Sequence, residues 1–154
     1  MKIIQVKDVY QLHGTASDTV FEDSSLEEIV RIFATKPALR CIFLINSSQR
    51  FAGIITPNDL LKWSTIMLLK GKVEIKSAEE AERIVFATKA MDLKADYWPS
   101  LGVKETDNLQ TALNQMIGSG ENILPVIDNQ GKILGDLRLS EILLKAFEVG
   151  KRET

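Results

Sequence analysis

The sequence is poor in the residues that build disulfide frameworks, transition-metal sites and most nucleophilic active sites. Its 154 residues include one cysteine, Cys41, and one histidine, His13. A single cysteine cannot form an internal disulfide, which excludes a disulfide-stabilised secreted scaffold as well as a multi-cysteine zinc site. Cys41 lies in the apolar run 41–45, so we expect it to be a small buried hydrophobic residue.

Long apolar runs and a strong charge of either sign are also missing. No run of about eighteen apolar residues occurs, so no membrane insertion is expected. The first fourteen residues, MKIIQVKDVYQLHG, are too interrupted for a signal peptide, and the expected location is cytoplasmic. A net charge of −2 argues against nucleic acid or an anionic membrane as the main partner. The apolar fraction of 45% is that of an ordinary soluble domain.

Motifs that carry chemistry are absent as well. The chain has no GxGxxG dinucleotide loop, no GxxxxGK[ST] phosphate loop and no HExxH zinc motif. The acidic pairs Glu27–Glu28 and Glu79–Glu80 lie on expected helix surfaces, where such pairs are usually solvated. The sequence therefore predicts no enzyme, no metal site and no required cofactor.

What the chain does contain is an internal repeat. Residues 41–61 align without a gap to residues 123–143, with Gly53 and Gly135 as anchors 82 residues apart. Each copy reads as a strand, a polar turn, a second strand with a glycine, and the start of a helix. The expected hairpin turns lie at Ser47–Ser48 and Asn129–Gly131.

The repeat extends upstream, where residues 19–33 parallel residues 102–116. Apolar residues recur there at helical spacing, and they are Leu26, Ile29, Val30 and Phe33 in one copy and Leu109, Ala112, Leu113 and Met116 in the other. Capping signals open both helices, Ser25 with Glu28 and Asp107 with Gln110. Each half is thus predicted to be a strand, a helix, a hairpin and a second helix.

The expected boundaries follow from this repeat. The first unit spans 7–71, the connecting region 72–88 and the second unit 89–150. An amphipathic helix is predicted over 77–91, and Gly71 is expected to end the helix before it. Each half is too small to bury its apolar strands alone, so we expect the halves to pack on each other.

The stretch GIITPNDLLKW, residues 53–63, has two compatible interpretations. Thr56 can cap the following helix, Pro57 suits the first helical position, and Asp59 lies three residues after Thr56 as in a capping box. The alternative interpretation is that the same side chains also hold a ligand, which is compatible with a capping role.

These features resemble a tandem pair of cystathionine-β-synthase (CBS) domains. The carriers are FLINSSQRFAGIITPNDLL in the first half and LPVIDNQGKILGDLRLSEIL in the second. The resemblance implies an α/β fold of two β-α-β-β-α units related by a pseudo-twofold axis, with their sheets packed together. Many members bind AMP, ADP, ATP or S-adenosylmethionine between the units, pair as homodimers and regulate an attached or partner enzyme, channel or transporter. Others have no known ligand.

The resemblance also implies roles for residues of the first half. Thr56 matches a position that contacts the ligand phosphate, and Asp59 one that accepts from both ribose hydroxyls. The adenine is expected near Leu39–Cys41 and near residues 12–15, although His13 there is more typical of a solvated side chain. The ligand-binding set predicted in this way is Leu39, Arg40, Cys41, Ile55, Thr56, Asn58 and Asp59.

The second half departs from the pattern. Arg138 stands at the threonine position and Glu141 at the aspartate position, and with Ile123 they form a second, altered site. Arg138 either pairs with a phosphate or forms an ion pair with Glu141 or Asp136 that fills the site.

Two functions therefore remain open, a sensor of an adenosine-containing ligand and a ligand-free dimerisation or protein-interaction module. Trp63 and Trp98 are expected in the core or at a dimer contact.

Overall fold

The computed structural model describes residues 3–10, 16–69 and 78–152 and contains two compact units. The first unit is formed by Ala16–Pro99, and the second by Ser100–Thr154 together with the chain start, Met1–Thr15. The expectations for His13, for residues 12–15 and for Gly71 lie outside the described residues. The predicted mixed α/β fold class is confirmed, and each unit is described by itself below.

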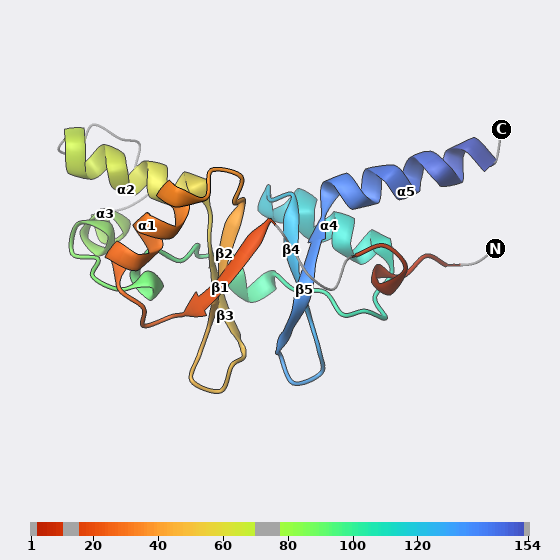
Figure 1. The fold of residues 1–154 in the computed structure, drawn as a ribbon, viewed down its shortest axis with the longest axis horizontal. Helices are drawn as coiled ribbons and strands as arrows, with labels where there is room; N and C mark the ends of the chain where they lie inside the picture. Colours follow the sequence, from red (N-terminus) through yellow and green to blue (C-terminus); the bar gives the residue numbers. More distant parts are fainter. Residues whose placement is uncertain (1–2, 11–15, 70–77, 153–154) are drawn as a thin grey trace. The chain divides into compact units, whose positions relative to one another are not determined.

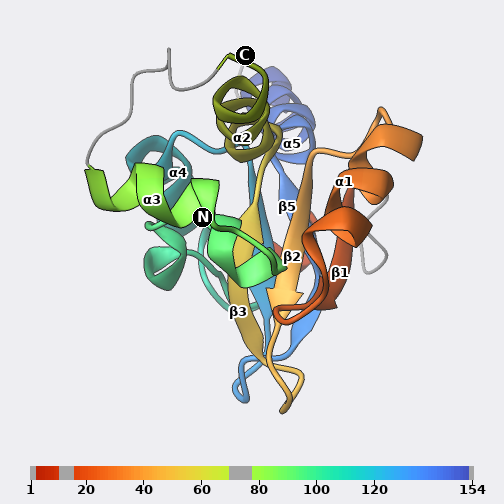
Figure 2. The ribbon, with the colours of Figure 1, turned by 90° about the vertical axis from the view of Figure 1, so that its left-hand side faces the viewer.

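A three-stranded sheet forms the centre of the first unit (Figure 1). The strands are β1 (Ser17–Phe21), β2 (Cys41–Ile45) and β3 (Phe51–Ile55), and they lie side by side in that order. Strands β1 and β2 are parallel and are joined through α1 (Leu26–Thr35), whereas β2 and β3 form an antiparallel hairpin. Figure 2 faces this unit and shows α1 on the β1 side of the sheet.

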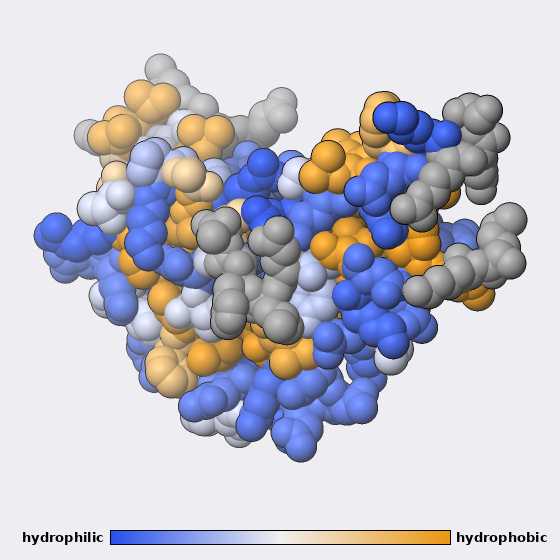
Figure 3. All heavy atoms as spheres, turned by 45° about the vertical axis from the view of Figure 1, so that its right-hand side comes forward, coloured by the Kyte–Doolittle hydropathy of each residue, from blue (hydrophilic) through white to orange (hydrophobic). Residues whose placement is uncertain are grey.

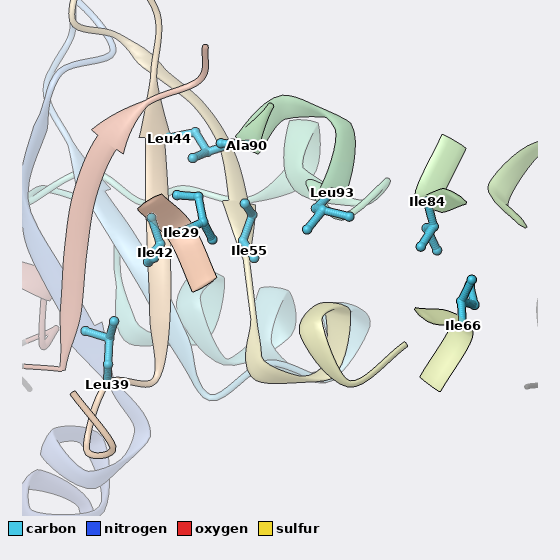
Figure 4. Close-up of a cluster of buried hydrophobic side chains, with 9 residues drawn as sticks. All are labelled: Ile29, Leu39, Ile42, Leu44, Ile55, Ile66, Ile84, Ala90 and Leu93. Atoms are coloured by element: carbon cyan, nitrogen blue, oxygen red, sulfur yellow. The ribbon is translucent and has the colours of Figure 1, made fainter. Parts of the chain in front are cut away.

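Apolar residues between this sheet and its helices form the core of the first unit. In Figure 4, Ile66 of α2 (Pro57–Leu69) and Ile84 of α3 (Ala78–Val85) point toward each other. The cluster also contains Ile29, Leu39, Ile42, Leu44, Ile55, Ala90 and Leu93. Trp63 is partly buried and packs against it, which matches the first of its two expected places, the core or a dimer contact, and the predicted burial of Cys41 is confirmed.

Helix α3 ends at Val85, whereas the sequence pattern predicts a helix that continues to residue 91. The residues that follow form backbone hydrogen bonds to the turn before α1. Ala90 N donates to Ser24 O at 2.8 Å and Met91 N to Glu22 O at 2.9 Å, so these donors are not available to a helix. A short 3-10 helix, η2 (Ala90–Leu93), replaces the end of the predicted helix.

The second unit repeats this plan with a smaller sheet. Strands β4 (Ile123–Ile127) and β5 (Ile133–Arg138) form an antiparallel hairpin that lies between α4 (Leu109–Ser119) and α5 (Leu139–Arg152) in the sequence. The expected leading strand is reduced to one parallel bridge between Val103 and Val126. The side-chain amide of Gln115 donates to Gly102 O and accepts from Gly102 N, both at 2.9 Å, and thereby occupies backbone groups that a longer strand would use.

The chain start packs on this second unit as η2 packs on the first. Helix η1 (Val6–Asp8) is followed by Tyr10, whose hydroxyl donates to Glu105 at 2.8 Å. Val6 N donates to Asp107 O at 2.8 Å, and the Val6 side chain is fully buried. Each compact unit is therefore completed by a 3-10 segment that precedes the other half of the repeat, so the units cross the boundaries that the repeat alone suggests.

Of the caps predicted for α1 and α4, the first is confirmed. Ser25 Oγ accepts from Glu28 N at 3.2 Å, as the capping signal of α1 predicts. For α4 the prediction is wrong, because the N-cap is Asn108, whose Oδ1 accepts from Thr111 N at 2.9 Å. Asp107 instead accepts from Lys104 N at 2.9 Å and closes the turn before the helix.

The two hairpins match in detail. Each has a register shift, between Leu44 and Ile45 in the first and between Val126 and Ile127 in the second. Asn46 Oδ1 accepts from Ser48 N and Arg50 N, and Asp128 Oδ1 likewise accepts from Gln130 N and Lys132 N. The left-handed turn position holds Gln49, with φ 62°, in one hairpin and Gly131, with φ 81°, in the other.

Candidate ligand-binding motifs

The predicted residues of the first half gather at one edge of the first unit. Antiparallel pairing places Ile42 opposite Ile55, so the beginning of β2 and the end of β3 meet at that edge. The parallel partner of Cys41 is Ser17, at the start of β1, and Arg40 N donates to Ala16 O at 2.7 Å. The segment 39–41 and the segment 55–59 are therefore neighbours.

Thr56 and Asp59 form a reciprocal cap at the beginning of α2. Thr56 N and Thr56 Oγ1 donate to Asp59 Oδ2 at 2.8 and 3.0 Å, and Asp59 N donates to Thr56 Oγ1 at 3.4 Å. Thr56 is 3% exposed and Asp59 is half-buried. The capping interpretation is confirmed, and the aspartate serves where a glutamate or glutamine is more usual.

A capping role is compatible with ligand chemistry. An ionised carboxylate has about four lone-pair sites, so a carboxylate that caps a helix can also accept from a vicinal diol. The Thr56 hydroxyl hydrogen points to Asp59 and must turn away from it to reach a phosphate. Phosphate binding at Thr56 would thus exchange one hydrogen bond for another, next to the N–H groups of the first turn of α2.

The other predicted residues differ in exposure. Leu39, Cys41 and Ile55 are buried, which suits an apolar wall, whereas Arg40 and Asn58 are exposed. The two buried residues on β2 and β3, Cys41 and Ile55, have no measurable exposure. Their side chains therefore fill the core, and only their backbone groups are suited to read the edge of a base.

Charged residues that the sequence did not predict to be near Asp59 form a cluster beside it. Arg83 of α3 donates to Asp96 at 2.8 Å, and this hydrogen bond, with the nearby charges of Asp96, Glu80 and Asp59, raises the pKa of Arg83 above its ordinary value. Lys62 donates to Glu80 at 3.3 Å across the α2–α3 contact. Only the amphipathic pattern of α3 hinted at this, since residues so distant in sequence give no local signal.

A small pocket lies among these charges. It has a volume of about 80 Å³ and is lined by Asp59, Lys62, Glu80, Arg83, Ile84 and the segment 92–97. Pockets that hold drug-sized ligands measure about 300–1,000 Å³, so this hollow by itself is too small for a nucleotide. Lys94 is used elsewhere, with Nζ 4.9 Å from the centre of the Trp98 ring and 3.4 Å from Ala52 O.

The second motif has the same backbone plan with different chemistry. Ile123 at the start of β4 pairs with Arg138 at the end of β5, and Arg138 N donates to Glu141 Oε1 at 3.0 Å. This bond is the counterpart of the one from Thr56 N to Asp59. The Arg138 side chain forms ion pairs with Asp136, Nε to Oδ1 at 3.2 Å, and with Glu141, Nε to Oε1 at 3.4 Å.

These ion pairs match the filled-site alternative for Arg138. Asp136 is fully buried, and the side chains of Glu141 and Arg138 are 9% and 17% exposed. The structure thus brings together Ile123, Arg138 and Glu141 at one edge of the second unit, with Asp136 beside them. Whether either motif holds a ligand stays a prediction.

Comparison with known proteins identifies the family. A model of the CBS domain matches residues 6–65 and 98–148. The chain therefore belongs to the CBS domain family and carries two copies in tandem. No curated protein matches it.

Solved structures of the same fold include ligand complexes. A CBS domain-containing protein from Thermotoga maritima is 28% identical, with 96% of this chain and 97% of that chain covered and a TM-score of 0.75. The structure of CBSX2 in complex with AMP is 18% identical, with 96% and 98% covered and a TM-score of 0.69. The CBS domain pair of protein MJ0100, in complex with 5-methylthioadenosine and S-adenosyl-L-methionine, is 16% identical, with 97% and 99% covered and a TM-score of 0.64.

None of the helices in the described part of the chain has both the length and the apolar character needed to cross a membrane.

Proposed function

We propose that the chain is a regulatory module that senses an adenosine-containing ligand, AMP, ADP, ATP or S-adenosylmethionine, through its first motif. The observation that carries the proposal is the Thr56–Asp59 pair at the start of α2, adjacent to the segment 39–41. A carboxylate for a diol, a hydroxyl with helix N–H groups for an anion and backbone edges for a base then lie along one edge. Similar domain pairs in complex with AMP and with S-adenosyl-L-methionine add to the argument.

A sensor of this kind acts by shifting a conformational equilibrium. The ligand stabilises whichever arrangement it binds more tightly, and the difference in affinity sets the size of the shift. An enzyme, channel or transporter attached to the module or docked on it would respond to that shift. No catalytic group is needed, and the module is proposed to be non-enzymatic.

Thermal melts of the purified protein with each of the four ligands test the proposal. A ligand at about a hundred times its dissociation constant adds about 2.7 kcal/mol, which raises Tm by several degrees. Asp59→Asn keeps an oxygen to cap α2 but loses acceptor sites for the diol, so the shift should fall. Asp107→Asn is the matched control, because Asp107 also accepts a hydrogen bond from a backbone N–H three residues away but lies outside both motifs. No shift with any ligand contradicts the proposal.

A second candidate, a ligand-free module that associates with another copy of itself, is favoured by exposed apolar side chains on α2 and α5. Leu61 and Leu68 of α2 are 63% and 80% exposed, and Leu144 and Phe147 of α5 are 70% and 71% exposed. Apolar residues gather over α5 at the upper right of Figure 3. Faces of this kind are typical of interaction sites. A homodimer is proposed under either function, and sedimentation of wild type against Leu144→Glu tests it.

A further inference from the structure

The second motif differs from the first by a matched pair of substitutions. The positions of Ile54 and Thr56 are taken, 82 residues later, by Asp136 and Arg138. A fully buried isoleucine is thus replaced by a fully buried aspartate, and the neighbouring hydroxyl by a guanidinium that pairs with it. The two changes compensate each other, because either charge alone would be buried without a counterion.

Arg138 is committed to its carboxylates. Its Nε lies between Asp136 Oδ1 at 3.2 Å and Glu141 Oε1 at 3.4 Å. Drawing the guanidinium toward a phosphate would weaken its pairing with Asp136, which has no exposure to water. The hydroxyl that Thr56 provides in the first motif has no counterpart at Arg138.

Glu141 has an acceptor that is not used. Its Oε2 is buried and has no hydrogen-bond partner among the described residues, and the side chain as a whole is 9% exposed. A buried acceptor without a donor is unfavourable, so this oxygen is suited to accept from a hydroxyl of a ligand. Two carboxylates against one guanidinium also give the cluster a formal charge of −1, which disfavours an approaching phosphate.

We infer that the second motif selects nucleosides without a phosphate group, with Glu141 as the acceptor for the ribose diol and the Asp136–Arg138 pair as the element that excludes phosphate. The inference rests on the proposed function, since it assigns a ligand class to the second copy of the same motif. It also makes Asp136 a residue that determines specificity, although Ile54, at the same position of the first motif, is not one of the predicted ligand-binding residues.

Calorimetric titration of the Asp59→Asn variant with adenosine and with AMP tests the inference, because that change weakens the first motif only. Adenosine should bind more tightly than AMP, by about tenfold.

Further substitutions in this variant test each residue. Adding Asp136→Asn releases Arg138 from one carboxylate and should improve the affinity for AMP relative to adenosine by a similar factor. Adding Glu141→Gln should weaken adenosine. Asp107→Asn in place of Asp136→Asn should change neither the affinity for adenosine nor the affinity for AMP relative to adenosine. Circular dichroism confirms folding, and if Asp136→Asn unfolds, Asp136→Ile with Arg138→Thr replaces it.

The outcomes separate the inference from the proposed function. AMP binding more tightly than adenosine in Asp59→Asn would overturn the inference and leave the sensor intact. Loss of all binding in Asp59→Asn, when wild type binds, would do the same. If wild type binds neither adenosine nor AMP nor any of the other three ligands, both fail.

Discussion

The two motifs share one backbone arrangement but carry different side chains. In both, the residue before the helix donates its N–H to a carboxylate three residues later, from Thr56 to Asp59 and from Arg138 to Glu141. The first motif completes this contact with a hydroxyl, and the second with a buried cluster of one guanidinium and two carboxylates. This backbone contact is the same in both motifs, so the motifs differ in the side-chain atoms that surround it.

The largest expected effect comes from breaking the charged cluster. Arg138→Ala leaves the buried carboxylates of Asp136 and Glu141 without their cation, and we expect a loss of about 3 kcal/mol in the free energy of unfolding. Thr56→Ala, the matched change in the first motif, removes only a capping hydroxyl and should cost about 1 kcal/mol. Urea denaturation of both variants measures the difference.

The same comparison predicts a rescue. Asp136→Ile combined with Arg138→Thr installs the residues of the first motif and removes the unpaired charge, so most of the lost stability should return. A double variant as unstable as Arg138→Ala would show that the cluster is not the cause.

A smaller effect is expected where the chain start meets the second unit. Burial of Tyr10, then its hydrogen bond to Glu105 and the charge of Glu105, raises the pKa of its hydroxyl from 10.0 to about 12. Because the folded state holds this proton more tightly than the unfolded chain, the contribution is complete below pH 10 and is lost as the pH rises toward about 12. Wild type should therefore lose more stability than Tyr10→Phe over that interval, as measured by urea denaturation. Equal losses would contradict the role of Tyr10.

The smallest effect is expected at the hairpin turns. Gln49 holds a left-handed backbone that Gly131 adopts without strain in the other hairpin. Gln49→Gly should stabilise the protein by up to about 1 kcal/mol, and Gly131→Gln should destabilise it by about the same amount. Thermal melts of the two variants should move in opposite directions, and a shared direction would refute the equivalence of the turns.

Local patterns predicted the elements that depend on local interactions. The hairpins, their turns, the Ser25 cap and the meeting of Thr56 with Asp59 follow from residues close together in the sequence. Two failures lie where distant segments compete for the same groups, whereas the misplaced cap of α4 is local. Hydrogen bonds to Ser24 and Glu22 end the predicted helix 77–91 early, and Gln115 limits the strand expected at Val103.

The candidate sites divide in the same way. The resemblance to CBS domains, carried by the repeated motif, pointed to Thr56, Asp59, Arg138 and Glu141 as candidate residues. It did not predict that Arg83 would lie near Asp59, since that contact requires α3 to fold against α2. The packing of the 3-10 segments was also not predicted. Each segment packs on the unit that contains the other half of the repeat, and the repeat itself gives no information about this.

The number of AMP molecules bound per chain tests most directly whether the two motifs are divergent copies of one ligand site. We would titrate wild type and the triple variant Asp136→Ile, Arg138→Thr, Glu141→Asp, which gives the second motif the residues of the first. The account predicts one tightly bound AMP in wild type and two in the triple variant. A stoichiometry that does not rise, in a triple variant that is folded and still binds at the first motif, would contradict it.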